Sequence, residues 1–307
     1  MTKKCLGCGI FLQDKSPYTL GYTPNVDNDY CERCFKITHY NAKIDASLSM
    51  NNDELIEKIN QKKAFIYLCD FFNLFDENID FYKRIKGPKC FLITKSDLIP
   101  KNIIKKKVLE KFKAYYKIEG EVLFCSVKVK ENLSTVLNIL QKNKKVLFAG
   151  TTNSGKSSLI NHLLGAKITV SKNANTTLDF IPLKFDFCTI FDAPGFLLPA
   201  FIDSGTPKSI VKPVVYQLKS KYCLCFMDIT LASNVDNNLT FYLSNTISIE
   251  KRKIKSSLSY DLAVAGNSDV FIKGLGFIHV VKASILHLSI DASLVFVRPS
   301  LIGGYHE

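Results

Sequence analysis

The chain has 307 residues, of which 47% are hydrophobic, and a formal net charge of +13. This length and apolar content predict two or three folded domains and exclude a generally disordered chain. The basic surplus favours polyanionic partners such as nucleic acid, a ribosomal particle or an anionic membrane surface.

The amino-terminal residues lack the apolar core of a signal peptide. The chain also lacks a run of about 18 apolar residues, the length that a membrane helix needs. We therefore expect a cytoplasmic protein without a membrane partner. Ten cysteines in such a chain predict metal ligands or buried thiols rather than disulfides.

Residues 1–45 contain two Cys-x-x-Cys knuckles, formed by Cys5, Cys8, Cys31 and Cys34. Two thiolates from each tight turn complete a tetrahedron around Zn²⁺, and a closed four-thiolate site is structural rather than catalytic. The alternative is four reduced cysteines without a metal. The other six cysteines lie in or beside apolar stretches and are expected to be buried thiols.

Residues 46–205 alternate short apolar stretches with polar, lysine-rich helical ones. This alternation predicts a mostly parallel sheet with helices on both faces. The predicted strands are Ala64 to Cys69, Cys90 to Ile93, Val122 to Cys125, Val146 to Ala149 and Cys188 to Phe191.

A guanine-binding motif follows the second of these strands. Thr94-Lys95-Ser96-Asp97 matches the pattern [NT]KxD, in which the Asp97 carboxylate accepts from N1–H and the exocyclic amine of guanine. The Lys95 stem is expected to pack along the base. After the third strand, Ser126-Val127-Lys128 suits the companion loop, where a backbone N–H meets guanine O6.

The fourth strand leads into a phosphate loop. Residues 150–157 read Gly-Thr-Thr-Asn-Ser-Gly-Lys-Ser and fit GxxxxGK[ST], with a predicted helix behind them. Backbone N–H groups of such a loop face the phosphates, Lys156 reaches the β- and γ-phosphates, and the Ser157 hydroxyl binds Mg²⁺. The predicted contacts of this loop are Asn153, Ser154, Gly155, Lys156, Ser157 and Ser158.

The fifth strand ends in Asp192-Ala193-Pro194-Gly195. Asp192 can hold a water on Mg²⁺, and the Gly195 N–H can contact the γ-phosphate. The polar segment Asn175 to Asp179 is expected to be a switch. Thr177 is its predicted Mg²⁺-sensing hydroxyl, with Thr176 as the alternative.

The order of the motifs is the most informative feature. Base motifs at 94 and 126 precede the phosphate loop at 150 and the DxxG motif at 192, whereas an ordinary GTPase has the phosphate loop first. The usual order of the GTPase motifs is thus circularly permuted. The same packing is still possible, because circular permutation moves only the termini.

These residues resemble the circularly permuted ribosome-assembly GTPases of the YqeH type. The resemblance is carried by the four cysteines, TKSDLIPK, SVK, GTTNSGKSSLIN, NTTLD and DAPG, and by Lys273 to Phe277, which is similar to that family's Gly-Leu-Gly-aromatic segment. It implies a GTPase domain at 46–205 and an RNA- or ribosome-contacting domain at 206–307, for which we expect a mixed α+β fold. The implied role is maturation of the small ribosomal subunit, with GTP, GDP, Mg²⁺ and Zn²⁺ as ligands.

Departures from the family pattern affect the expected chemistry. Thr94 stands where many relatives have Asn, so an amide contact holding the base loop is expected to be lost. Phe196 follows Gly195, and a phenyl ring cannot orient an attacking water. GTPases with a hydrophobic residue at this position resemble potassium-dependent members, in which an Asn at the position of Asn153 coordinates K⁺. We expect slow, K⁺-stimulated hydrolysis in which Asn153, Lys156, Thr177 and Gly195 take part.

Lysine clusters at 101–117, 142–145 and 251–255 favour rRNA within the small ribosomal subunit or its precursor as the partner of a monomer. An alternative function is an RNA-binding assembly scaffold that holds GTP with little hydrolysis. A tRNA-modifying GTPase lacks support, because the sequence offers no cofactor site for that chemistry.

Overall fold

The computed structural model of the protein describes residues 3–6, 11–15, 21–32, 35, 51–62, 64–163, 180–184, 187–198, 202, 207–254 and 260–302. The contacts divide the chain into two compact units, each with its own sheets and its own core. The first unit consists of Met1–Asp70, Glu77–Thr94 and Gly120–Leu197, and the second of Phe71–Asp76, Lys95–Glu119 and Leu198–Glu307. The domain boundaries expected at residues 45 and 205 stay predictions.

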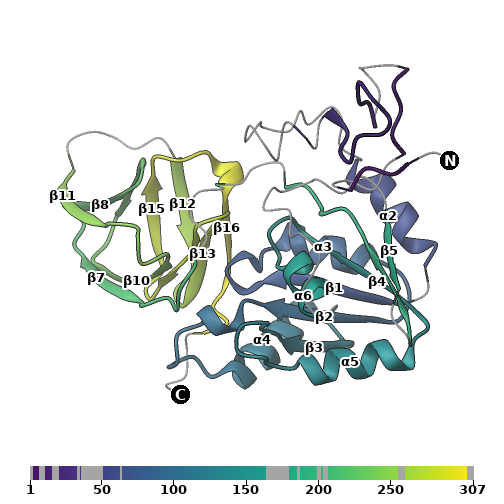
Figure 1. The fold of residues 1–307 in the computed structure, drawn as a ribbon. Coiled ribbons are helices and arrows are strands. Elements are labelled where there is room, and N and C mark those ends of the chain that lie inside the picture. The colour runs from purple at the N-terminus through teal and green to yellow at the C-terminus, as the bar shows by residue number, and fades with distance from the viewer. Residues whose placement is uncertain are drawn as a thin grey trace. The chain divides into compact units, whose positions relative to one another are not determined.

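A six-stranded sheet forms the centre of the first unit, in the order β3-β2-β1-β4-β6-β5 (Figure 1). Its strands are β1 (Phe65–Asp70), β2 (Lys89–Thr94), β3 (Glu121–Phe124), β4 (Lys145–Gly150), β5 (Ile181–Lys184) and β6 (Thr189–Asp192). All neighbours are parallel except β5 and β6. The five strands predicted from apolar stretches are confirmed, and β5 is an additional antiparallel strand at the edge.

The pairing of β1 with β4 closes the permuted sheet. β1 lies before the phosphate loop in the chain, yet it pairs with β2 on one side and with β4 on the other. The half of the chain that carries the base motifs therefore continues the same sheet as the half that carries the phosphate loop. This strand order is the structural counterpart of the permuted motif order.

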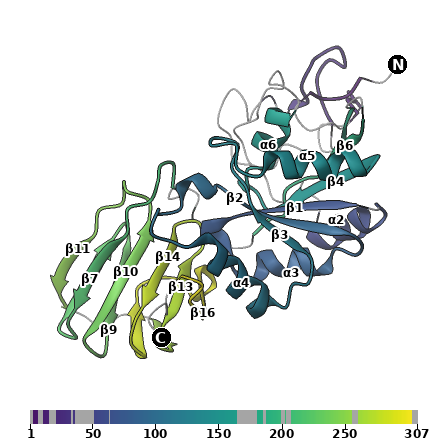
Figure 2. The ribbon, with the colours of Figure 1, turned by 90° about the horizontal axis from the view of Figure 1, so that it is seen from below.

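Helices cover both faces of this sheet, as predicted (Figure 2). On one face α5 (Leu133–Lys142) and α6 (Lys156–Leu163) share a hydrophobic core with β1, β2, β4 and β6. The buried residues of α5 are Leu133, Val136 and Leu140, a spacing of three and four that places them on one side of a helix. On the other face lie α2 (Asn52–Asn60) and α3 (Asp76–Arg84), where the Tyr67 hydroxyl donates to the Asn78 carbonyl at 2.7 Å.

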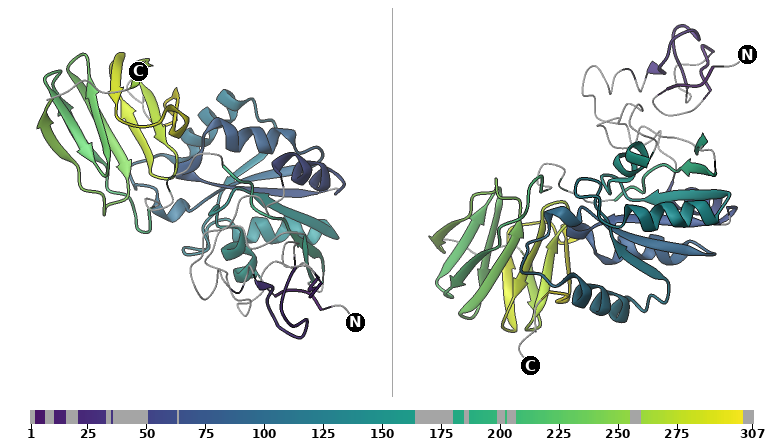
Figure 3. Two further views of the ribbon diagram at one scale, coloured as in Figure 1. Left: turned by 90° about the horizontal axis from the view of Figure 1, so that it is seen from above. Right: turned by 60° about the horizontal axis from the view of Figure 1, so that its bottom comes forward.

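The second unit contains two five-stranded antiparallel sheets that face each other (Figure 3). One has the order β16-β13-β14-β10-β7 and the other β11-β8-β9-β15-β12. Their strands are β7 (Val214–Leu218), β8 (Tyr222–Phe226), β9 (Ile229–Ser233), β10 (Asn237–Leu243), β11 (Glu250–Lys253), β12 (Tyr260–Val264), β13 (Ser268–Ile272), β14 (Gly276–Val280), β15 (Ser284–Leu288) and β16 (Val295–Pro299).

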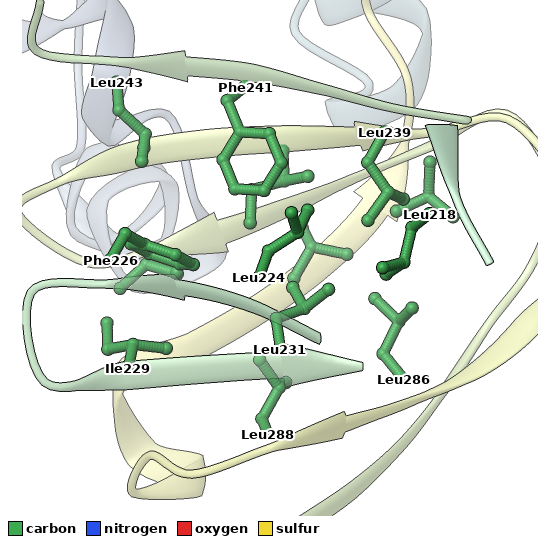
Figure 4. Close-up of a cluster of buried hydrophobic side chains, with 14 of the residues drawn as sticks. Leu218, Leu224, Phe226, Ile229, Leu231, Leu239, Phe241, Leu243, Leu286 and Leu288 are labelled. Carbon is green, nitrogen blue, oxygen red and sulfur yellow. The ribbon is translucent and has the colours of Figure 1, made fainter. Parts of the chain in front are cut away.

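Side chains from both sheets meet in one core. Figure 4 shows Leu239, Phe241 and Leu243 of β10 directed toward Phe226 and Leu231 of the opposite sheet. The expected mixed α+β fold is wrong for residues 207–254 and 260–302, which form a β-sandwich with one short 3-10 helix, η4 (Ala292–Leu294). The reason is the burial pattern, because β15 and the first five residues of β10 alternate between buried and more exposed positions with the period of two that a strand requires.

Segments from the earlier part of the chain also belong to the second unit. These are two 3-10 helices, η2 (Phe71–Asn73) and η3 (Ser96–Leu98), and the helix α4 (Lys105–Tyr116). The Phe71 ring lies 5.9 Å from the Phe277 ring, and the Gly274 N–H donates to the Asn73 side chain at 3.2 Å. The Lys273 to Phe277 turn thus serves as a docking point for the chain that follows β1.

Candidate nucleotide site

The carboxyl ends of the parallel strands meet at one edge of the six-stranded sheet. In the strand register Asp70 is opposite Thr94, Leu68 opposite Gly150, and Phe148 opposite Asp192. The base motif, the phosphate loop and the DxxG motif each begin where one of these strands ends. Ligands of open parallel sheets bind at this edge.

The phosphate loop turns tightly from β4 into α6. A Cβ atom on Gly150 would lie 2.3 Å from the Leu68 carbonyl oxygen, so only glycine fits there. Asn153 and Gly155 have φ angles of 61° and 86°, in the left-handed region. Asn and Gly are the residues that adopt this region most readily. The Ser157 and Ser158 side chains are exposed at the start of α6, where they are accessible to a ligand.

Lys156 forms an ion pair with Asp192 through Nζ and Oδ1. Both side chains are largely buried, with 9% and 13% of their surface exposed. Phosphate oxygens that bind Lys156 would compete with this carboxylate and release it for Mg²⁺. The Ser157 hydroxyl and the Asp192 carboxylate supply the oxygen donors that Mg²⁺ prefers, so these residues fit that ion. Thr176 and Thr177 lie outside the described residues.

Thr94 connects the base motif to the phosphate loop. Its hydroxyl donates to the Ser154 carbonyl at 2.5 Å. A hydroxyl contact with the phosphate-loop backbone is therefore present at the position where the amide contact was expected to be lost. After Thr94 the chain turns through Lys95, whose φ is 57°, into η3, which contains Asp97. The contact of Asp97 with a guanine base stays a prediction.

The companion loop is held closed at its base. Ser126 and Glu131 exchange two backbone hydrogen bonds, of 3.3 and 2.9 Å, and the Val129 N–H donates to the Ser126 hydroxyl at 3.3 Å. Lys128 is exposed at the tip. Val127 is half-buried against the core of the first unit, and the contact of this loop with guanine O6 stays a prediction.

The DxxG segment lies along the phosphate loop. The Phe196 N–H donates to the Gly150 carbonyl at 3.0 Å, and the Phe196 carbonyl accepts from the Thr152 N–H at 3.2 Å. A Cβ on Gly195 would lie 2.9 Å from Thr152 Cγ2, so this glycine is needed for the close approach. The DxxG segment and the phosphate loop are therefore in direct contact, an arrangement that the motifs alone do not reveal.

Two of the four predicted zinc ligands lie within the described residues. The Cys5 and Cys31 side chains are buried, and the Cys31 N–H donates to Cys5 Sγ at 3.2 Å. Cys8 and Cys34 lie outside the described residues. Within the described part of the chain no three His, Cys, Asp or Glu side chains converge as a metal site. The pair that is described suits a thiolate site, since a backbone N–H directed at sulfur stabilises the negative charge.

The remaining cysteines fit their predicted role as packing residues. Cys69, Cys90, Cys125, Cys188 and Cys223 are buried, and Cys225 is half-buried. Burial raises the pKa of Cys90 to about 12 and that of Cys125 to about 11, so both thiols stay protonated at neutral pH. No helix in the described part of the chain is long and apolar enough to cross a membrane.

Comparison with known proteins agrees with this geometry. Residues 79–200 match the model of the RsgA GTPase family, and residues 145–258 match that of the 50S ribosome-binding GTPases. The chain is 25% identical to YqeH of Bacillus subtilis, an uncharacterized protein, in an alignment of 287 residues that covers 82% of this chain and 78% of YqeH. Together with the permuted motif order, these matches support a circularly permuted GTPase similar to those of the YqeH type.

Two further matches are more limited. The chain shares 43% identity over 54 residues with the probable GTP-binding protein EngB of Methanosarcina mazei, which is 18% of this chain and 26% of EngB. The crystal structure of YjeQ from Thermotoga maritima matches 48% of this chain and about half (52%) of its own, at 21% identity and a TM-score of 0.34. GTPase domains of this kind bind GTP and GDP with Mg²⁺ and hydrolyse GTP.

Proposed function

We propose that this GTPase is a nucleotide-dependent switch in assembly of the small ribosomal subunit, hydrolysing GTP slowly. The observation that carries the switch is the contact between the DxxG segment and the phosphate loop at Thr152 and Phe196. If one of these two segments binds the γ-phosphate, the other segment must respond, because the two are hydrogen-bonded to each other. The ribosomal role is supported by the matches to the RsgA and 50S ribosome-binding GTPase families.

The phosphate site would act through position and charge. Lys156 would neutralise the β- and γ-phosphates, while Ser157, Asp192 and the predicted Thr177 would hold Mg²⁺ directly or through water. The Gly195 N–H would contact the γ-phosphate. Mg²⁺ supplies charge stabilisation when it is bound, and Asn153 is the proposed K⁺ ligand.

The guanine base would be read by Asp97, with Lys95 packing along it and the Val127–Lys128 backbone facing O6. Asp97→Asn replaces an acceptor by an amide that no longer accepts from both guanine donors. We expect this variant to lose affinity for GTP and to prefer xanthine nucleotides. Titration of fluorescent GTP, ATP and xanthosine nucleotides measures it, and equal affinity of the unmodified protein for ATP and GTP would contradict the assignment.

Zinc belongs to the proposal as a structural ion. Four thiolates, from Cys5, Cys8, Cys31 and Cys34, match its preferred ligands, and the described Cys5–Cys31 contact supports their convergence. The site would stabilise the amino-terminal module and take no part in hydrolysis.

Basic surfaces support rRNA as the partner. The edge strand β11 is exposed throughout and reads Glu-Lys-Arg-Lys. Lys106 and Lys107 are exposed on α4, whereas Val108, Phe112 and Tyr116 are buried. Such faces neutralise phosphates without reading bases. An RNA-binding scaffold with little hydrolysis stays the alternative, and multiple-turnover hydrolysis in the presence of ribosomal subunits separates the two.

A further inference from the structure

Asn52 is a residue of the first unit that makes an unusual contact with the switch. Its side-chain amide donates to the Leu197 carbonyl at 2.8 Å, and its side-chain oxygen accepts from the Leu197 N–H at 3.0 Å. Leu197 is the second residue after Gly195. The Asn52 carboxamide therefore forms hydrogen bonds with both the N–H and the carbonyl of Leu197, as a neighbouring β-strand would.

Phe196, the residue between Gly195 and Leu197, is held just as firmly. The Phe196 backbone bonds to Gly150 and Thr152, and its ring is fully buried. The ring stacks on Phe81 with 4.5 Å between centroids and 9° between planes. The end of the DxxG segment is thus fixed by the phosphate loop, by an aromatic core and by Asn52.

Asn52 itself rests on a fixed support. It is the first residue of α2, which buries Leu55, Ile56 and Ile59 and is capped by the Asn51 side chain. Asp53, the next residue, pairs with Arg84 of α3 at 2.5 Å. Leu197 is therefore anchored to a packed helix rather than to a loop.

We propose that Asn52 is a positioning residue for the γ-phosphate, because it fixes the chain immediately after Gly195. This inference rests on the proposed GTPase function. A segment anchored at Leu197 samples fewer conformations, so the Gly195 N–H loses less freedom when it binds the γ-phosphate. GDP has no γ-phosphate and gains nothing from the anchor. Asn52 thereby favours GTP over GDP without touching the nucleotide.

The chain offers a matched control at the other end of the same helix. Asn60 also bonds to backbone with both side-chain atoms, accepting from the Lys86 N–H at 2.8 Å and donating to the Arg84 carbonyl at 3.3 Å. Both asparagines are half-buried. The Asn60 contacts lie at the last residue of α3 and just after it, not on the switch.

The experiment compares Asn52→Ala and Asn60→Ala in the full chain. We expect Asn52→Ala to lower the ratio of affinities for a non-hydrolysable GTP analogue and for GDP by about fivefold, close to the worth of one neutral hydrogen bond. The kcat should fall with it. Asn60→Ala should leave the ratio within about twofold while costing a similar amount of thermal stability.

A second variant separates positioning from helix stability. Asn52→Asp keeps an acceptor for the Leu197 N–H, places a favourable negative charge at the helix N-terminus, and removes the donor to the Leu197 carbonyl. It should lower the ratio although α2 stays intact. An unchanged or increased ratio in both Asn52 variants would overturn the proposal, whereas a lack of GTP binding by the unmodified protein would overturn the proposed function instead.

Discussion

Thr94 illustrates how one hydroxyl can replace a longer side chain. It ends β2, and its hydroxyl donates to the Ser154 carbonyl in the phosphate loop. A buried carbonyl without a partner costs roughly 1–3 kcal/mol, so this contact stabilises the loop in its turned conformation. The base motif and the phosphate loop are consequently joined before any ligand binds.

Phe196 and Asn153 together determine the expected ion dependence. The Phe196 ring is buried against Phe81, and it cannot orient a water molecule. Asn153 is exposed on the phosphate loop, as a K⁺ ligand must be. Hydrolysis should be faster in KCl than in NaCl at equal ionic strength, because K⁺ supplies positive charge near the phosphates.

The variant that checks this must respect the backbone. Asn153 has a φ of 61°, which alanine adopts only with strain, so Asn153→Gly removes the carboxamide without distorting the loop. Its hydrolysis rate should be the same in both salts. If the unmodified protein also hydrolyses GTP equally fast in KCl and NaCl, the K⁺ proposal is wrong.

Among the elements, the buried parallel strands were predictable and the edge strand β11 of the sandwich was not. Strands β1 and β4 are covered on both faces and therefore read as continuous apolar stretches. β11 reads Glu-Lys-Arg-Lys and is exposed throughout, which leaves no apolar pattern to find. The Asn52 contact was equally hidden, because hydrogen bonds between residues 145 positions apart leave no local signal.

The turn at Gly274 is expected to be important for the stability of the second unit. Gly274 has a φ of +90°, and a Cβ there would lie 2.1 Å from the Ile202 carbonyl oxygen. The Ile202 N–H donates to the Lys273 carbonyl at 3.0 Å, so the chain after the switch is docked on this turn. Gly274 is thus required by both its conformation and its neighbour.

Gly274→Ala should lower the free energy of unfolding by more than about 2 kcal/mol, because strain and overlap add. Gly266→Ala is the control in the same sandwich, since its φ is not positive and its Cβ would lie 3.1 Å from the Val281 carbonyl. That variant should lose less than about 1 kcal/mol. Urea unfolding measures both, and equal losses would show that the Gly274 turn is not special.

At the scale of the whole molecule, circular permutation places the switch directly before the carboxyl-terminal unit. The chain runs from Gly195 through Leu197, held by Asn52, to Ile202, held by Lys273. An ordinary motif order would insert the base-binding half at this point. The covalent path from the proposed γ-phosphate contact at Gly195 to the second unit is therefore short in sequence.

This connection predicts that the nucleotide changes the affinity for the small ribosomal subunit. Coupling free energies are typically about 1–3 kcal/mol, so a GTP analogue and GDP should give affinities that differ several-fold. Affinity should also fall steeply with salt, because lysines that neutralise phosphates release counterions on binding. Co-sedimentation with subunits at several salt concentrations measures both effects.

Gly195→Ala should abolish the nucleotide difference, provided that nucleotide is saturating, because the added Cβ meets Thr152 in the phosphate loop. Equal binding of the two nucleotide forms at every salt concentration would instead favour the scaffold, which needs charge but no switch.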